Sequence, residues 1–562
     1  IALSFRIDKS KTVSTSTLRW NLINFLNGDY RPSTTKECTP HERIKQQRLP
    51  RLRDLIIRLK APEFANDLRC SIFNGIDQQG SEYNLRVLLE DEFSHQLNND
   101  QQDAVRMAVS GKDYTLIQGL PGTGKTSTLT FLARLFMAKG KKVLITAYTH
   151  SAVDNIMLKL IEKGMGSTNA QSGTSELVRL GNKNSCHESV KTILYSELAR
   201  KVDTMSENLG KTGDYPQHPS AISIKRVITD ARIVGVTALS LPRSPLLQNE
   251  IFDVVIIDEA GQINEPATLG AISAADTFIL VGDHKQLPPL VNNMIAEKSG
   301  YGTSVLKRLA DEHPHAIAQL TIQYRMNEDI CRICSEAMYE GRMKCGNEKV
   351  GSQLLKLPYY PALVPKPIND ERCVSWLRSV VDPERPVIFV DTDNICIHTD
   401  NSSLEGKVGG KAGGSIVNRT EATLARYILS ALHLCGHDLS DIGVISPFRA
   451  QIGTILDSPT IQSWKKIGLE LSTIDKYQGR DKSTIVLSLV RSNDRKIVGR
   501  LLQDERRLNV ALTRAKKKLI VIGSFRTLKN GSNTLNPILE RMDERNQRIQ
   551  LPQNAIECYN IP

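Results

Sequence analysis

The chain has 562 residues and a mass of 62.6 kDa, enough for three or four domains of about 150 residues each. Hydrophobic residues make up 40% and charged residues 24%, as in soluble globular proteins, and no apolar run approaches the ~18 residues of a membrane span. Lys and Arg exceed Asp and Glu by 73 to 61, and this net charge of +12 favours a polyanionic partner such as nucleic acid.

Residues 1–96 form a first block that is rich in basic side chains. The chain begins without Met, so we expect the N-terminus of the whole protein to lie upstream. Leu52, Leu55 and Leu59 recur at helical spacing among arginines, which predicts a charged amphipathic helix. This helix is either a solvated surface element or a stalk or arm. The ten cysteines are too sparse for a secreted disulfide framework and indicate a reducing compartment.

Short apolar strands alternate with helical segments from about residue 97 onward, which is typical of parallel sheets covered by helices on both faces. In a second block, residues 97–320, the predicted strands are 114–119, 141–148, 231–239, 252–260 and 277–283. In a third block, residues 321–545, they are 386–391, 441–447, 484–490 and 518–524. We predict that 203–220 and 401–416 are surface insertions and that 546–562 form a C-terminal tail.

The sequence GLPGTGKT at residues 119–126 fits the pattern G-x-x-x-x-G-K-[ST] of phosphate-binding loops in full. It follows a predicted strand and opens a helix, so backbone N–H groups and the positive end of the helix would face phosphate oxygens. We expect Lys125 to reach the β and γ phosphates of ATP, and the Thr126 hydroxyl to ligate Mg²⁺. The residues predicted to contact the nucleotide here are Gly119, Gly122, Thr123, Gly124, Lys125 and Thr126.

Two adjacent acids, Asp258 and Glu259, end the apolar run VVII of the second block. Because ligands bind at the carboxyl ends of strands in open α/β sheets, we predict that Asp258 holds Mg²⁺ and that Glu259 polarises the attacking water. Phosphoryl transfer also needs positive charge beside the γ-phosphate. Arg325 in QYRMN and Arg514, which we predict to lie in a helix before a strand, are candidates for this role.

The order of these motifs resembles that of superfamily 1 helicases, with eight matching segments over about 420 residues. LNNDQ (97–101) resembles the adenine-reading glutamine motif, and GDHKQLPP (282–289) the motif that senses the γ-phosphate. The resemblance implies nucleotide contacts from Gln101, Asp283, Tyr324, Gly479 and Asp481, and catalytic roles for Lys125, Glu259, Gln286, Arg325 and Arg514. It implies nucleic-acid contacts from His150, Asn155, Thr237 and Thr473.

Within that superfamily, the chain resembles the eukaryotic DNA replication ATP-dependent helicase/nuclease family. The segments that carry the likeness are YTHSAVDNI (148–156), VGDHKQLPPLV (281–291), QYRMNEDI (323–330), YEGRMKCG (339–346), DKYQGRDKS (475–483) and LVRSN (489–493). The resemblance implies an α/β fold of two RecA-like P-loop domains with parallel sheets, which bind ATP between them. Residues 1–96 would be the end of an accessory β-barrel and a helical stalk.

This family resemblance also implies a function. The chain would be an ATP-dependent DNA helicase that moves 5′ to 3′ on single-stranded DNA. Full-length members would carry an upstream single-strand endonuclease with an iron–sulfur cluster, and would process Okazaki flaps and resect double-strand breaks. Implied partners are flap or forked DNA and single-strand-binding protein, without a membrane, in the nucleus and also in the mitochondrion. Two alternatives stay open: an RNA helicase of the same superfamily, and a nucleotide-gated nucleic-acid clamp without turnover.

The sequence departs from this family at few positions. Gly261 stands where relatives usually have Ser, and Glu505 where an aromatic residue is common, but neither change removes a charge needed for hydrolysis. Cys331, Cys334 and Cys345 lack a fourth ligand, so we interpret them as buried or incidental thiols rather than as a metal site.

Overall fold

The computed structural model divides the chain into two compact units. It describes residues 72–76, 81–169, 172–207, 219–247, 250–365, 371–395, 405–408 and 415–559. The first unit ends at Leu320, and the second contains the rest of the chain together with 121–123 and 285–287. The predicted barrel end and the predicted amphipathic helix that contains Leu52, Leu55 and Leu59 lie outside the described residues.

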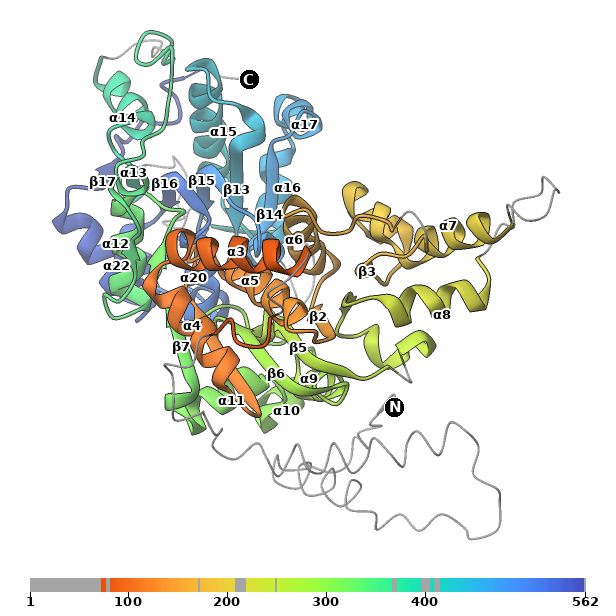
Figure 1. The fold of residues 1–562 in the computed structure, drawn as a ribbon. Coiled ribbons are helices and arrows are strands. Elements are labelled where there is room, and N and C mark those ends of the chain that lie inside the picture. The colour runs from red at the N-terminus through yellow and green to blue at the C-terminus, as the bar shows by residue number, and fades with distance from the viewer. Residues whose placement is uncertain are drawn as a thin grey trace. The chain divides into compact units, whose positions relative to one another are not determined.

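Seven parallel strands form the sheet of the first unit, in the order β3-β4-β2-β5-β6-β1-β7 (Figure 1). They are β1 (Tyr114–Gly119), β2 (Val143–Ala147), β3 (Leu177–Arg179), β4 (Ile233–Thr237), β5 (Phe252–Asp258), β6 (Ala275–Gly282) and β7 (Ile317–Leu320). The five predicted strands are confirmed. The two that were not predicted, β3 and β7, are short strands at the two edges of the sheet.

Both faces of this sheet are covered. Val254 and Ile256 of β5 belong to a buried cluster with α5 (Lys125–Ala138) and α6 (His150–Glu162). Their neighbours Val255 and Ile257 belong to a second cluster with α9 (Glu265–Ile272) and α11 (Val305–Glu312). Because alternate residues of a strand point to opposite faces, a strand buried on both faces reads as a continuous apolar run.

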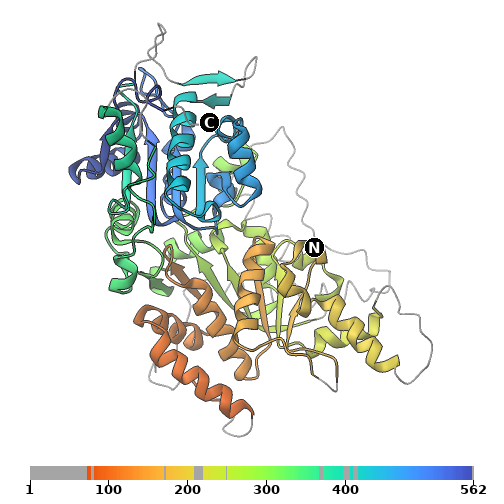
Figure 2. The same cartoon turned by 90° about the horizontal axis from the view of Figure 1, so that it is seen from above.

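The second unit has a six-stranded parallel sheet in the order β14-β13-β15-β16-β10-β17. Its strands are β10 (Val387–Asp391), β13 (Ile442–Ser446), β14 (Glu470–Thr473), β15 (Lys482–Ser488), β16 (Ala515–Gly523) and β17 (Arg548–Gln550). Figure 2 shows these strands between helices, with green α12 (Glu328–Met338) and cyan α15 (Arg419–Leu434) both packed against β16. The four predicted strands are confirmed, and again the two edge strands were not predicted.

The two polar interruptions contain regular structure. Helix α7 (Tyr195–Glu207) continues into the first, and α8 (Ala221–Asp230) begins directly after it. In the second, β11 (Gly406–Val408) and β12 (Ser415–Val417) form a two-stranded antiparallel sheet. The remaining residues of both interruptions lie outside the described part of the chain.

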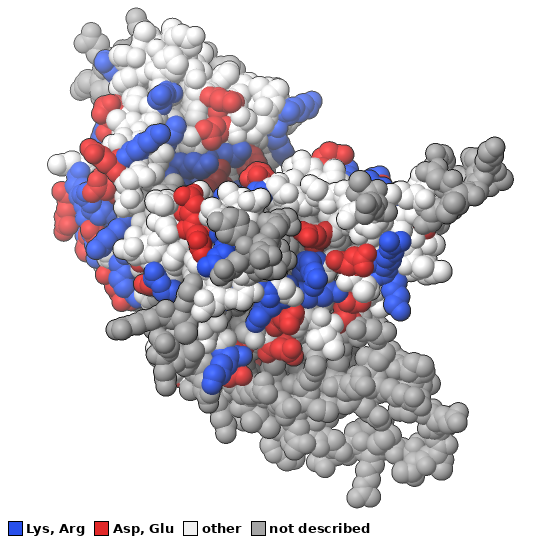
Figure 3. Space-filling model, in the orientation of Figure 1, with Lys and Arg blue, Asp and Glu red and all other residues white. Residues whose placement is uncertain are grey.

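Charge is mixed on the face of the molecule shown in Figure 3, where described Lys and Arg side chains are interspersed with Asp and Glu. Much of the basic surplus instead belongs to residues 1–71, which hold 14 Lys and Arg against 7 Asp and Glu. Within the part of the chain that the structure describes, no helix is long and apolar enough to cross a membrane.

Candidate functional site

The phosphate loop lies between β1 and α5, as its motif predicts. Gly122 and Gly124 have φ values of +76° and +80°, a backbone region that side chains rarely adopt. A Cβ atom at Gly124 would also lie 2.6 Å from Nε2 of Gln101. Glycine at these positions therefore lets the loop take the conformation that places backbone N–H groups around an anion.

Lys125 and Gln101 are both held against this loop. Nζ of Lys125 donates to the carbonyl oxygens of Gly119 at 2.9 Å and Leu120 at 3.4 Å. The side-chain oxygen of the buried Gln101 accepts the N–H of Asn98 at 3.1 Å in the capping box that starts α4 (Asn99–Ser110). The amide oxygen of Gln101, the residue predicted to read adenine, therefore accepts a hydrogen bond within the cap of its own helix.

Asp258 and Glu259 lie at the carboxyl end of β5. Oδ1 of Asp258 accepts the N–H of Glu259 at 2.9 Å, and Gln262 donates its Nε2 to Oε2 of Glu259 at 2.9 Å. Burial, and then the neighbouring Glu259, raise the pKa of Asp258 to about 7, while Lys125 acts in the opposite direction. A buried carboxylate in this environment favours a bound cation. The hydroxyl of Thr126 and the Asp258 carboxylate are oxygen donors of the kind Mg²⁺ prefers.

The remaining predicted nucleotide contacts of the first unit lie at the same edge of the sheet. Strands β5, β6 and β1 are adjacent and parallel, so their carboxyl ends, with Asp258, Asp283 and Gly119, face one side. A Cβ atom at Gly261 would lie 3.2 Å from the carbonyl oxygen of Asp283, so the acid motif packs closely on this segment. The departure from Ser to Gly therefore relieves a tight contact.

Arg325 lies next to the tip of the phosphate loop, within the second unit. The N–H of Tyr324 donates to the carbonyl of Gly122 at 2.9 Å, and a Cβ atom at Gly122 would lie 2.7 Å from Cβ of Arg325. Gln286, which the motif assigns to the γ-phosphate, is buried in the same unit. Within the second unit, the QYR segment therefore packs against the backbone of Gly122.

Asp481 holds the Arg325 side chain. Nε of Arg325 lies 2.8 Å from Oδ2 of Asp481, and the guanidinium also donates to the carbonyl of Thr513 at 3.3 Å. Oδ1 of Asp481 pairs with Lys516 at 3.1 Å. Burial by itself would raise the pKa of Asp481, but the positive charges of Arg325 and Lys516 hold this pKa below its usual value. In this structure Asp481 orients an arginine that was predicted to be catalytic. Gly479, two residues earlier, adopts a φ of +79°.

Arg514 is not in a helix, contrary to the prediction. Helix α20 (Glu505–Leu512) ends before it, and Arg514 lies in the turn that leads into β16. Its Nε donates to the carbonyl of Val510 at 2.9 Å and its Nη2 to Oγ1 of Thr513 at 2.8 Å. The buried side chain thus folds back and satisfies a carbonyl that the end of the helix leaves without an N–H partner.

Gln323 and Gly346 position this segment, and neither was predicted as a site residue. Oε1 of the fully buried Gln323 accepts the N–H groups of Arg325 and Met326, both at 2.7 Å. Its Nε2 donates to the carbonyl of Met326 at 2.8 Å and to Sγ of Cys345 at 3.0 Å. Both residues lie in segments that carry the family resemblance, QYRMNEDI and YEGRMKCG. The spacing of these segments along the chain does not show that they contact each other.

Gly346 leaves room for the ring of Tyr324, which is 42% exposed. A Cβ atom at Gly346 would lie 2.2 Å from Cε1 of that ring. We expect Gly346→Ala to displace the ring and to raise the KM for ATP about tenfold, as for a lost base–aromatic contact. Steady-state kinetics check this, with Gly453→Ala, where a Cβ meets open space, as control. An unchanged KM would show that Tyr324 does not contact the nucleotide.

Two of the four predicted nucleic-acid residues lie where the neighbouring strands β2 and β4 end. His150 begins α6 directly after β2, and Thr237 ends β4, the strand that pairs with β2 in the register Ala147–Thr237. Oγ1 of Thr237 donates to Oγ of Ser240 at 2.8 Å. Asn155 is exposed farther along α6. Thr473 ends β14 and belongs to the second unit.

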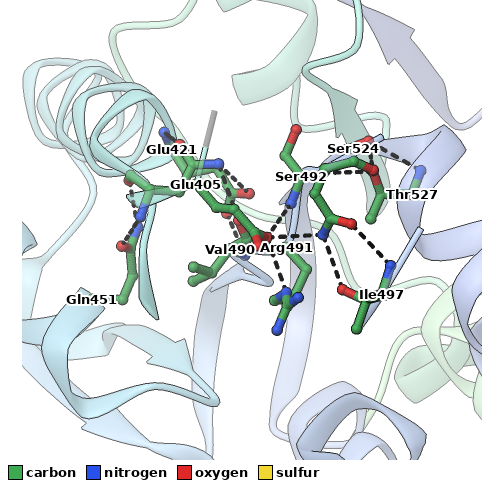
Figure 4. Close-up of polar contacts among 11 residues, drawn as sticks. Glu405, Glu421, Gln451, Val490, Arg491, Ser492, Ile497, Ser524 and Thr527 are labelled. Atoms are coloured by element: carbon green, nitrogen blue, oxygen red, sulfur yellow. Dashed lines mark hydrogen bonds and ion pairs between the residues drawn. The ribbon is translucent and has the colours of Figure 1, made fainter. Parts of the chain in front are cut away.

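A strained turn follows β15, so this strand ends two residues earlier than predicted. Val490 has a φ of +72°, which is unusual for a β-branched residue, and the N–H of Arg491 donates to the carbonyl of Leu489 at 2.8 Å. Figure 4 shows how carboxylates hold this turn: Glu421 accepts the N–H of Val490 at 2.9 Å, and Glu405 pairs with Arg491 at 2.9 Å. A turn this constrained presents LVRSN in one conformation.

The three cysteines after QYRMN are thiols. Cys331 and Cys334 are buried on α12, and Cys345 is half-buried beside Gln323. Burial raises the pKa of Cys334 to about 12. Among the described residues, no group of three or more His, Cys, Asp or Glu side chains is arranged to hold a metal ion.

Comparison with known proteins identifies related sequences. Two family profiles, each described as an AAA domain, match the chain. One matches residues 96–220 and 197–294, and the other matches residues 301–526. The chain is 37% identical over 505 residues to the DNA replication ATP-dependent helicase/nuclease of Schizosaccharomyces pombe, covering 90% of this chain and 32% of that protein. It is 36% identical over 510 residues to the Homo sapiens protein of the same name, covering 90% and 43%.

The chain therefore spans less than half the length of these curated relatives. Among solved structures, an arterivirus nonstructural protein 10 (helicase) aligns with a TM-score of 0.35 and 13% identity, covering 74% of this chain and 61% of that one. At this TM-score the fold assignment rests on the strand order and the phosphate loop described above.

Proposed function

Because the chain belongs to the DNA replication ATP-dependent helicase/nuclease family, we propose that it is an ATP-dependent DNA helicase that translocates on single-stranded DNA. The observation that carries the proposal is the phosphate loop, whose two glycines adopt left-handed conformations between a buried strand and a helix. The paired acids at the end of β5 supply the other half of a nucleotide-hydrolysing site.

In the proposed mechanism, the phosphates of ATP bind to the backbone of residues 119–126 and to Lys125. Thr126 and Asp258 would hold Mg²⁺, which when bound neutralises charge on the phosphates. Glu259 orients and polarises the attacking water. Gln286, Arg325 and Arg514 stabilise the charge that develops on the γ-phosphate, with Arg325 oriented by Asp481.

His150, Asn155, Thr237 and Thr473 are the proposed contacts to the nucleic-acid backbone. Contacts of this kind carry little base preference, as a protein that moves along a strand requires. Movement 5′ to 3′ is proposed from the family. For the longer protein we propose, on the same basis, an upstream nuclease with an iron–sulfur cluster, flap or forked DNA as substrate and single-strand-binding protein as partner. Its proposed locations are the nucleus and the mitochondrion.

The experiment that tests this function measures ATP turnover without nucleic acid, with single-stranded DNA and with single-stranded RNA of the same length. We expect DNA to stimulate turnover much more than RNA does. Equal or stronger stimulation by RNA would contradict the DNA assignment and favour an RNA helicase of the same superfamily. Binding without any stimulation would favour a nucleotide-gated clamp.

A further inference from the structure

A buried arginine, Arg179, lies beneath the proposed nucleic-acid contact His150. Arg179 ends β3 and has no exposed surface. Its Nε donates to Oδ1 of Asp154 at 2.8 Å, and Asp154 lies one helical turn after His150 on α6. Both charges are withdrawn from water, so each needs its remaining polar atoms satisfied by protein.

The guanidinium group of Arg179 has three other partners. Its Nη1 donates to the backbone carbonyls of Leu180 and Gly235, and its Nη2 lies 3.2 Å from Nδ1 of His150. A guanidinium has donors only, so Nδ1 of His150 has to be the acceptor. The proton of a neutral His150 ring is therefore on Nε2, the nitrogen that faces away from Arg179.

The surroundings of this ring favour its neutral form. Burial lowers the pKa of His150 below its usual value, and Arg179 lowers it further. Asp154 acts in the opposite direction, but its carboxylate is already paired with Arg179. Within the described part of the chain, the charged groups that act on the ring are Arg179 from β3 and Asp154 from α6. Together with burial, they leave His150 uncharged at pH 7.

The same network reaches β4, the strand that Thr237 ends. Gly235, whose carbonyl lies 3.5 Å from Nη1 of Arg179, precedes Thr237 by two residues in β4. The second oxygen of Asp154 accepts the backbone N–H of His187 at 2.8 Å. One guanidinium thus joins the start of α6, the end of β3 and β4, at the edge where the two proposed contacts lie.

We propose that Arg179 and Asp154 are positioning residues that hold His150 as a neutral donor, whose Nε2–H binds a phosphate oxygen of the nucleic-acid backbone. This inference rests on the proposed function and adds the chemical form of one contact. A neutral hydrogen bond fixes a phosphate in position but releases no counterion. This contact is therefore insensitive to salt, unlike those made by lysine or arginine.

The first test compares two substitutions of His150, each of which keeps a polar atom at the position of one of the two ring nitrogens. In His150→Gln the amide nitrogen reaches the position of Nε2, whereas in His150→Asn the amide oxygen replaces Nδ1 and the outer donor is lost. We expect His150→Asn to raise the Kd for single-stranded DNA about tenfold, as for a lost hydrogen bond to a charged group. His150→Gln should stay within about threefold. The same two changes at exposed His315 of the first unit are matched controls.

The salt dependence of the Kd separates a neutral contact from a charged one. Under the proposal, the slope of log K against log salt concentration is the same for the parent and for His150→Asn. A protonated His150 would add about 0.7 to that slope, so a shallower slope in the variant would overturn the proposal. Equal losses for the Asn and Gln variants would overturn it as well.

A measurement on the free protein tests the role of Arg179 directly. In ¹⁵N spectra of histidine-labelled protein, we expect the His150 signal, identified by its loss in His150→Gln, to show Nε2 protonated and Nδ1 bare at pH 7. A charged ring or an Nδ1–H tautomer would overturn the proposal. In Arg179→Met, where circular dichroism shows a folded chain, both tautomers should appear. This measurement uses no nucleic acid. A protein that does not bind DNA would therefore contradict the proposed function in the binding assay and leave the tautomer of His150 to be decided by these spectra.

Discussion

Lys125→Ala is expected to abolish ATP hydrolysis while the chain keeps its fold. The ammonium group lies across the phosphate loop, 2.9 Å from the carbonyl of Gly119, where it would meet the β and γ phosphates. Loss of one preorganised positive group at a phosphoryl-transfer site lowers turnover by at least about 10²- to 10³-fold. The loop itself is shaped by its glycines, and α5 is held by its buried apolar residues, so neither depends on the lysine.

Steady-state ATPase assays with saturating single-stranded DNA measure this effect, and thermal unfolding shows whether the fold persists. Lys225→Ala, at an exposed position on α8 of the same unit, is the matched control and should keep parental turnover. Retained turnover in a folded Lys125→Ala protein would contradict the assignment of residues 119–126 to the nucleotide phosphates.

Glu259→Gln is expected to bind ATP and to hydrolyse it at least about a hundredfold more slowly than the parent. The amide has the size of the carboxylate, and its oxygen can still accept the hydrogen bond that Gln262 donates to Oε2. What it lacks is the negative charge that polarises water. Because Asp258 is unchanged, we expect nucleotide affinity to stay close to that of the parent.

Single-turnover hydrolysis and fluorescent nucleotide binding separate these two quantities. Glu176→Gln, an exposed position in the first unit, controls for the loss of one carboxylate. Near-normal hydrolysis by Glu259→Gln would show that another group orients the water. A loss of binding equal to the loss of turnover would instead place Glu259 in ground-state contact with the nucleotide.

Central strands were predictable and edge strands were not. Each of the nine predicted strands lies between two neighbours in a sheet covered on both faces, and burial on all sides demands a continuous apolar run. In the two large sheets the four unpredicted strands, β3, β7, β14 and β17, have three or four residues each and stand at the sheet edges. An edge strand has one neighbour and needs fewer apolar residues, so its sequence resembles that of a loop.

The incorrect placement of Arg514 in a helix has a similar cause. The helix that holds RRLNVAL was predicted to include Arg514, and the residues TRAKKK contain no Pro or Gly that would end a helix locally. The chain instead turns so that β16 can pair with β10 and β15, and the arginine caps the helix end that this turn exposes. Strand pairing over long sequence separations decided the boundary.

The sequence by itself determined the features that lie along continuous stretches of chain: the phosphate loop between a strand and a helix, the paired acids at the end of a strand, and the similarity to named relatives. These depend on local backbone conformation and on which side chains carry charge. Only the tertiary structure decided which donors and acceptors meet, as when Gln323 shapes the turn of Arg325, Gly346 leaves room for Tyr324, and Nη2 of Arg179 lies 3.2 Å from Nδ1 of His150. The physical reason is that close packing joins groups that spacing along the chain leaves unrelated, and a buried polar atom takes whichever partner that packing supplies.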